Sequence, residues 1–322
     1  DFSYLTDRMN DIEAIFLTHG HEDHIGAVPY LLRERSDIRI IGSQLTLAFV
    51  APKLKERRIT APMTQVKAGQ IEKVGPFTLE FVTVNHSIPD SLAVAIKTPA
   101  GVVLHTGDFK MDKMPLDGKV TDLETFARLG AEGVDLFLVD STNADIPGLT
   151  VAEKDIYPAL KEAIAKTPRR VVVTSFASHV HRIQQVLTAA NEANRKVAYV
   201  GRSMIRNMKL AEDLGYLKVP NGLVVDYKDI DTFGDKIVLI CTGSQGEPLA
   251  ALSRIANGDH EIQVGKGDTV VLASSLIPGN EKSVYRVINE LTRFGAHVVH
   301  KGNAMVHVSG HASAGELLHC YE

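Results

Sequence analysis

The chain has 322 residues, of which 44% are hydrophobic and 23% are charged, so it can bury a sizeable core in one or two domains. Its formal net charge of -4 gives no overall attraction for nucleic acid, so any such binding must come from a local basic track or a bound metal. The sequence has only two cysteines and no CxxC motif, and it has no apolar run of roughly 18 residues and no signal-peptide pattern. We therefore expect a soluble, cytoplasmic protein.

In the first part of the chain, the sequence pattern predicts short strands and one helix. Residues 12–18 form an apolar run typical of a strand, and residues 25–35 have the apolar spacing of a helix. Further strands are expected at residues 38–42, 77–86, 92–98 and 101–108. Several of these strands end on a polar or ionisable residue, which is how a sheet presents chemical groups at one edge.

From about Pro147 the pattern changes to a regular alternation of strands and helices. The expected strands are residues 170–178, 196–201, 222–226, 236–244 and 268–275, and the expected helices are 179–193, 203–214, 248–256 and 281–294. Continuous Val and Ile runs of this kind are buried on both faces, which indicates a parallel α/β domain. No GxGxxG follows the first strand, so dinucleotide binding has no support.

The stretch after the first strand has the pattern HxHxDH, with His19, His21, Asp23 and His24. Imidazole and carboxylate groups suit zinc or a similar divalent ion. The alternative is a helix-entry loop in which Asp23 caps the helix and the histidines are solvated, but four potential ligands in six positions favour metal. Because so short a loop cannot easily direct four groups at one ion, we expect two ions about 3.5 to 4 Å apart, which need a bridging carboxylate and further histidines.

Two strand ends supply candidates for those ligands. They are His86 in "VNHSIPD" and Asp108 in "HTGDF". Taken singly, His86 is as well explained as an edge or core histidine and Asp108 as a turn residue after Gly107. Both follow strands downstream of HxHxDH, so together they favour a metal site.

These motifs resemble those of a known family. "THGHEDHIG", "NHSIPD" and "HTGDFK" are similar to successive motifs of the metallo-β-lactamase superfamily. With "DSTN", "SFASHVHR", "GRSM", "CTGSQGEP", "SSLIPGNE" and "HVSGHAS", the whole chain resembles the ribonuclease J family of the β-CASP branch, in an actinobacterial form. The resemblance implies an α/β fold: a metallo-β-lactamase αβ/βα sandwich at residues 1–147, an inserted parallel α/β β-CASP domain at 148–303, and a return into the first domain at 304–322.

The resemblance also implies roles for the candidate residues. It makes His19, His21 and His86 the ligands of one Zn²⁺, Asp23 and His24 the ligands of a second, and Asp108 the bridge, with Mn²⁺ or Mg²⁺ as alternative metals. The catalytic residues would be Asp108, His311 near the scissile phosphate, and Asp140, which orients that histidine. The implied substrate-binding residues are His307, Val308, Ser309, Gly310 and His311. A glycine-rich first strand and a Pro-x-His-Gly-Glu-like motif of the family do not occur here, so we expect a fragment lacking both ends.

The implied activity is that of a zinc-dependent ribonuclease on single-stranded RNA, preferably 5′-monophosphorylated. It would act as a 5′-to-3′ exonuclease and an endonuclease in mRNA decay and rRNA maturation, as a homodimer or homotetramer and as a possible member of an RNA-degradation complex. One alternative is a hydrolase of thioesters or β-lactams on the same fold, against which the long α/β insertion argues. The other is an inactive RNA-binding scaffold, against which the near-complete ligand set argues.

Three further segments carry weaker signals. "HVHR" at residues 179–182 opens a helix, where positions two apart diverge, so packing or a phosphate contact is favoured over metal binding. "CTGSQGEP" and "HVSGHAS" are small-residue loops that either direct N–H groups at a phosphate or form plain turns. "KLKERR" at residues 53–58 is interpreted as a solvated helix face, with an RNA-backbone contact as the alternative.

Overall fold

The computed structural model describes residues 2–322 and divides into two compact units. Unit 1 comprises the residues up to Thr150 together with Gly310–Glu322, and unit 2 comprises Val151–Ser309. The expected boundaries were residues 147 and 303. The division thus lies three and six residues later, and it leaves Thr150 with its hydrogen-bond partner Glu316 in unit 1 and Val306 with its partner Arg182 in unit 2.

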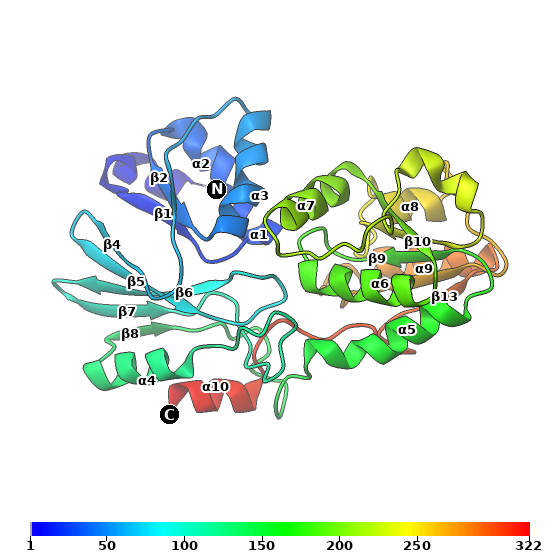
Figure 1. The fold of residues 1–322 in the computed structure, drawn as a ribbon. Helices are drawn as coiled ribbons and strands as arrows, with labels where there is room; N and C mark the ends of the chain where they lie inside the picture. The colour runs from blue at the N-terminus through cyan, green and yellow to red at the C-terminus, as the bar shows by residue number, and fades with distance from the viewer. Residues whose placement is uncertain (1) are drawn as a thin grey trace. The chain divides into compact units, whose positions relative to one another are not determined.

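Unit 1 contains two sheets and their helices (Figure 1). In chain order its elements are η1 (Ser3–Asp11), β1 (Ala14–Leu17), α1 (Glu22–Ile25), α2 (Val28–Glu34), β2 (Arg39–Gly42), α3 (Gln44–Glu56), β3 (Met63–Gln65), β4 (Ile71–Val74), β5 (Phe77–Thr83), β6 (Leu92–Thr98), β7 (Gly101–His105), α4 (Leu123–Glu132), β8 (Leu136–Leu138) and α10 (Ala314–Tyr321). Strands β1, β2 and β3 form a parallel sheet. Strands β4 to β8 form the second sheet, which is antiparallel except for the β7–β8 pair.

The alternation of side chains along β6 explains how unit 1 is layered. Leu92 and Val94 point into a buried cluster that also contains Ile41 of β2, so this face packs against the parallel sheet. Ala93 and Ala95 point the opposite way, into a cluster with Phe126 and Leu129 of α4 and Leu317 of α10. Figure 1 shows α4 and α10 together on that side of the sheet. The αβ/βα sandwich expected for this part of the chain is therefore confirmed.

Unit 2 is a parallel sheet with helices. Its elements are η2 (Glu153–Ile156), α5 (Tyr157–Lys166), β9 (Val171–Thr174), α6 (Val180–Glu192), β10 (Lys196–Val200), α7 (Arg202–Asp213), η3 (Tyr227–Phe233), β11 (Ile237–Cys241), α8 (Ala251–Ala256), β12 (Thr269–Leu272), α9 (Glu281–Arg293) and β13 (His297–Val299). The strand order is β10-β11-β9-β12-β13, and every pair is parallel. All five residues of β11 are buried, as expected for a central parallel strand. No helix within residues 2–322 combines the length and the apolar character needed to cross a membrane.

Two sequence-based expectations were wrong in detail. Residues 222–226 do not form a strand, since only Val224 makes an isolated bridge to Val197. The Asp226 side chain instead caps η3 by accepting from Lys228 N, which ends the extended stretch. The helix expected at residues 25–35 begins later, at Val28 of α2, because residues 26 and 27 form a turn after α1, and the proline of α2 lies in its first turn, where proline is tolerated. The short strands β3, β4, β8 and β13 were not predicted.

Candidate active site

The candidate site in unit 1 is built from loops that follow strands. His19 and His21 follow β1, His86 follows β5, and Asp108 follows β7. Gly107 has φ +60°, and a Cβ atom at this position would lie 2.8 Å from Thr18 Cβ. A glycine therefore permits the close approach of the two loops that carry His19 and Asp108.

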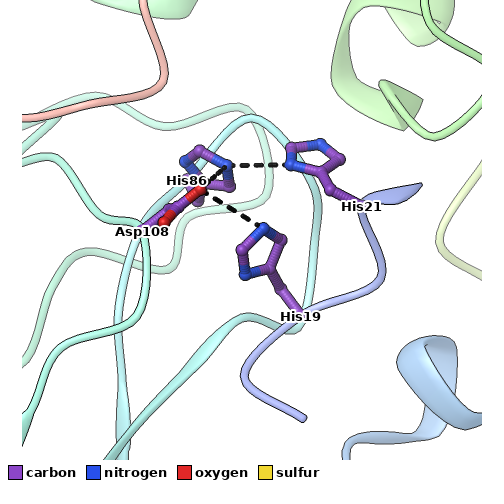
Figure 2. A group of neighbouring side chains, drawn as sticks. All are labelled: His19, His21, His86 and Asp108. Carbon is purple, nitrogen blue, oxygen red and sulfur yellow. Dashed lines mark hydrogen bonds and ion pairs between the residues drawn. The ribbon is translucent and has the colours of Figure 1, made fainter. Parts of the chain in front are cut away.

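Four of the candidate ligands form one group. His19, His21, His86 and Asp108 each offer a ligand atom, and these atoms all lie within 4.8 Å of one another. Figure 2 shows the three imidazoles and the carboxylate gathered in one place. His86 Nε2 is 3.0 Å from His21 Nδ1, and Asp108 Oδ2 is 3.6 Å from His19 Nε2 and 3.8 Å from His86 Nε2.

Burial keeps the histidines of this group neutral. Desolvation, assisted by the neighbouring imidazoles, lowers the pKa of His21 to about 3 and holds the pKa values of His19 and His86 well below the usual range. His19 is completely buried, and its Nε2 forms no hydrogen bond with any of residues 2–322. An unsatisfied buried polar atom costs about 1–3 kcal/mol. When His19 Nδ1 donates to the Thr18 hydroxyl, 3.0 Å away, Nε2 has a lone pair that a cation would satisfy. Three neutral imidazoles and one carboxylate fit a metal ion.

The contact between His86 and Gly310 fixes which nitrogen of His86 can face a metal. His86 Nδ1 lies 2.7 Å from Gly310 O, so Nδ1 carries the proton and donates it to this carbonyl. The lone pair is then on Nε2, the atom that faces His21 and Asp108. A Cβ atom at residue 310 would lie 2.8 Å from His86 Cε1, so only glycine allows this contact.

A second group shares Asp108 with the first. Ligand atoms of Asp108, Asp140 and His311 also lie within 4.8 Å of one another. His311 Nδ1 is 2.8 Å from Asp140 Oδ2. Burial opposes charge on both side chains, but the mutual hydrogen bond outweighs it, raising the pKa of His311 and lowering the pKa of Asp140 to about 2. The hydrogen bond therefore favours the charged forms of both side chains.

The two remaining residues of HxHxDH differ from each other. His24 Nε2 lies 3.1 Å from Asp108 Oδ2. Burial alone would lower the pKa of His24, but the hydrogen bond and charge of Asp108 outweigh it and raise the pKa. The Asp23 side chain is 80% exposed and lies 3.6 Å from His24 Nε2. The structure thus brings His24 to the shared carboxylate and leaves Asp23 facing solvent, and a second metal position that uses both remains a prediction.

The expected substrate segment crosses the division between the units. His307, Val308 and Ser309 belong to unit 2, whereas Gly310 and His311 belong to unit 1. Within unit 2, His307 Nδ1 lies 3.3 Å from Nη1 of Arg182, and Val308 is buried.

Sequence reasoning missed a buried carboxylate next to this segment. Glu316 accepts hydrogen bonds from Met111 N, Thr150 N and Ser313 N. The signal that could have found it is the capping-box pattern Ser-x-x-Glu at residues 313–316, which marks a helix start.

The comparisons with known proteins match both units. Residues 7–130 match the family model "Metallo-beta-lactamase superfamily", and residues 168–291 match "Ribonuclease J, beta-CASP domain". The chain is 52% identical to ribonuclease J of Mycobacterium tuberculosis and 51% identical to that of Corynebacterium glutamicum over its full length, and 45% identical to that of Thermus thermophilus over 98% of its length. It spans 58%, 45% and 56% of these three relatives, respectively.

A solved structure agrees at the level of the fold. A protein of unknown function from Enterococcus faecalis V583 aligns with a TM-score of 0.67 and 17% identity, over 95% of this chain and 72% of that one. The sandwich with its His/Asp cluster defines a metallo-β-lactamase-fold protein that carries a β-CASP domain. Within that superfamily, the chain belongs to the ribonuclease J family.

Proposed function

We propose that the protein is a zinc-dependent ribonuclease that hydrolyses phosphodiester bonds in RNA. The observation that carries the proposal is that Asp108 belongs to two groups of potential metal ligands. One contains the histidines His19, His21 and His86, and the other contains Asp140 and His311. This shared position supports a carboxylate that would hold metal and also face the pair of Asp140 and His311. The relatives named ribonuclease J support RNA as the substrate.

The metal ligands proposed are His19, His21 and His86 for one ion and His24 with Asp23 for a second, with Asp108 shared. Bound zinc supplies Lewis acidity toward a phosphate oxygen and lowers the pKa of water so that hydroxide is available near neutral pH. Asp23 has to turn inward to join its ion, because its side chain now faces solvent.

The pair of His311 and Asp140 is proposed to serve the leaving group. Asp140 Oδ2 accepts from His311 Nδ1 and from Phe109 N at 3.2 Å, so the carboxylate is held from two directions. With Nδ1 engaged and the pKa of His311 raised, the protonated ring can donate from Nε2 to the departing 3′ oxygen. Asp140 is thus a positioning residue, and it also stabilises the imidazolium.

The preference for RNA ends is a further part of the proposal. We expect residues 307–311 to bind the substrate, with the N–H groups of Ser309 and Gly310 directed at a 5′ phosphate. This would favour 5′-to-3′ exonuclease action on 5′-monophosphorylated single strands, while an internal segment of RNA would be cut endonucleolytically. Roles in mRNA decay and rRNA maturation remain predictions. Assembly as a homodimer or homotetramer, membership of an RNA-degradation complex and a cytoplasmic location are predictions as well.

The experiment uses one RNA, labelled at either end and bearing a 5′ monophosphate, triphosphate or hydroxyl, in the presence of zinc or manganese. The wild type is expected to release mononucleotides from the 5′-monophosphorylated form fastest. Asp108→Asn should abolish cleavage of all three forms, whereas Glu22→Gln, which changes an exposed acid next to His21, should cleave normally. If Asp108→Asn still cleaves RNA, the proposed role of the Asp108 carboxylate as a ligand shared by two metal ions is wrong. Turnover of a thioester or a β-lactam, with no cleavage of RNA, would favour the other hydrolase classes.

A further inference from the structure

We propose that Glu316 is a positioning residue that orients His311 by holding its loop against the loops of Asp108 and Asp140, an inference that rests on the proposed function. Glu316 lies in the first turn of α10 and is only 1% exposed. Its Oε1 accepts from Met111 N at 2.9 Å. Its Oε2 accepts from Thr150 N at 3.0 Å, from Ser313 N at 2.8 Å and from the Thr150 hydroxyl.

The donors come from three separate segments, each connected to a candidate catalytic residue. Met111 follows Asp108 in the loop after β7, and Ser313 follows His311 directly before α10. Thr150 ends the segment that begins at Asp140. The carboxylate therefore connects the three loops whose ends carry Asp108, Asp140 and His311.

Additional contacts extend this connection to the backbone of His311 itself. The Thr150 hydroxyl lies 3.0 Å from His311 O, and Asn143 Nδ2 donates to the same carbonyl at 3.2 Å. Asn143 belongs to the loop of Asp140, so this one loop contacts both the carbonyl of His311 and its ring, which bonds to Asp140 through Nδ1. The angle at which the ring presents Nε2 is then set by both its side-chain and its backbone contacts.

A helix-capping role alone does not explain these contacts. The capping box of α10 needs only the reciprocal pair of Ser313 and Glu316. The bonds to Met111 and Thr150 span 205 and 166 residues of sequence, and they use the remaining acceptor positions of a buried carboxylate. Hydrogen bonds from backbone N–H groups to a buried carboxylate are directional and strong, so they fix the loops rather than merely filling space.

The principal test is Glu316→Gln, which keeps the size of the side chain but replaces one acceptor oxygen with an NH₂ donor that faces other N–H donors. We expect kcat on 5′-monophosphorylated RNA to fall about 10- to 100-fold, since displacements of about 1 Å have effects of this size. KM and bound zinc should stay within about twofold of the wild type. Because Glu316 is proposed to act through His311, the same change in a His311→Ala background should lower kcat less than about threefold.

Asp268→Asn is the matched control in unit 2. Asp268 is also 1% exposed, and its carboxylate accepts from Arg170 N at 3.1 Å and from Gly265 N at 2.9 Å. It should lose thermal stability as Glu316→Gln does, with kcat within about threefold of the wild type. An equal loss of kcat in both variants, or an undiminished effect of Glu316→Gln in the His311→Ala background, would assign Glu316 a structural role only.

Two further measurements separate this inference from the proposed function. Thr150→Val removes the hydroxyl next to Glu316 and His311 O with little change in volume, and it should lower kcat severalfold even where Glu316→Gln folds poorly. In metal-free protein with ¹⁵N-labelled histidine, Glu316→Gln should shift the ring signals of His311, and Asp268→Asn should not. If the wild type cleaves no RNA, the proposed function fails, but the shift of the His311 ring signals still tests the role of Glu316. If Glu316→Gln leaves the His311 ring signals unshifted, the positioning role of Glu316 is overturned.

Discussion

Two segments of the molecule contain His-x-His, and the structure uses them in opposite ways. In unit 1, His19 and His21 lie on the loop after β1 and face Asp108 and His86. In unit 2, His179 directly precedes α6 and His181 lies in its first turn. Both pairs are largely buried, so burial does not distinguish them.

The two histidine pairs differ in the charged side chains that lie beside them. The first pair meets one carboxylate and other imidazoles, so neutral rings with available lone pairs result. The second lies beside Arg182, whose guanidinium donates to both oxygens of Glu153, at 2.7 and 3.1 Å. His179 and His181 belong to no group of potential metal ligands in the described part of the chain. In the described part of the chain, the histidine pair beside Asp108 forms a candidate metal site, and the pair beside the buried guanidinium of Arg182 does not.

The largest expected difference between the two segments is in metal binding. His19→Ala should weaken zinc binding by more than about 100-fold, above the range found for residues that only support a ligand, and should abolish RNA cleavage. His179→Ala should leave zinc affinity unchanged. Titration of the metal-free protein with zinc in a calorimeter measures both, and equal affinities in the two variants would contradict the comparison.

The next effect concerns the ion pair beside the second segment. Arg182→Gln leaves Glu153 buried without its cation, which should lower the free energy of unfolding by about 3–5 kcal/mol. Arg195→Gln is the control, because Arg195 is also buried but donates to backbone carbonyls, such as Asp235 O at 2.8 Å, and should cost about 1–3 kcal/mol. Urea denaturation followed by circular dichroism compares them, and equal losses would mean that the charge of Glu153 is compensated in another way.

Acid should destabilise the metal-free first segment. The pKa of His21 is about 3 in the folded protein, compared with 6.5 as its ordinary value, so the unfolded state takes up the proton first as the pH falls. The corresponding stability is complete above pH 6.5 and is lost as the pH falls toward 3, by at most about 1.4 kcal/mol per pH unit for this histidine. His21→Asn should remove that part of the slope in denaturation curves between pH 6.5 and 5. An unchanged slope would show that the buried ring does not titrate in this way.

The smallest effect is expected on the outer side of the same loop. Glu22 has a side chain that is 73% exposed and pairs with Lys53 at 2.5 Å. Exposed pairs of this kind contribute about 0.2–1 kcal/mol, so Glu22→Gln should change the unfolding free energy by less than about 1 kcal/mol. Zinc titration should match the wild type. A weaker zinc affinity would show that the loop depends on its solvent-facing contacts as well as on its inward ones.

The sequence predicted the parts of the site that follow apolar strands. His19, His86 and Asp108 could be named because each stands where such a run ends, and the structure gathers them in one group. Glu316 and Arg182 were not assigned their partners, because those partners include backbone groups of segments distant in sequence, which leave no pattern of side chains. Residues 222–226 have the composition of a strand, but a local cap at Asp226 prevented one.

The hydrogen bond from His86 to Gly310 also has a consequence in time. The two residues are 224 positions apart, with all of unit 2 between them. At a synthesis rate of about 5–20 residues per second, a ribosome needs about 11–45 s to reach Gly310 after it has made His86. During that interval the nascent chain has the histidines of its first loops but lacks His311 and the acceptor that orients His86. The proposed active site is therefore incomplete on the growing chain until Gly310 and His311 have been synthesised.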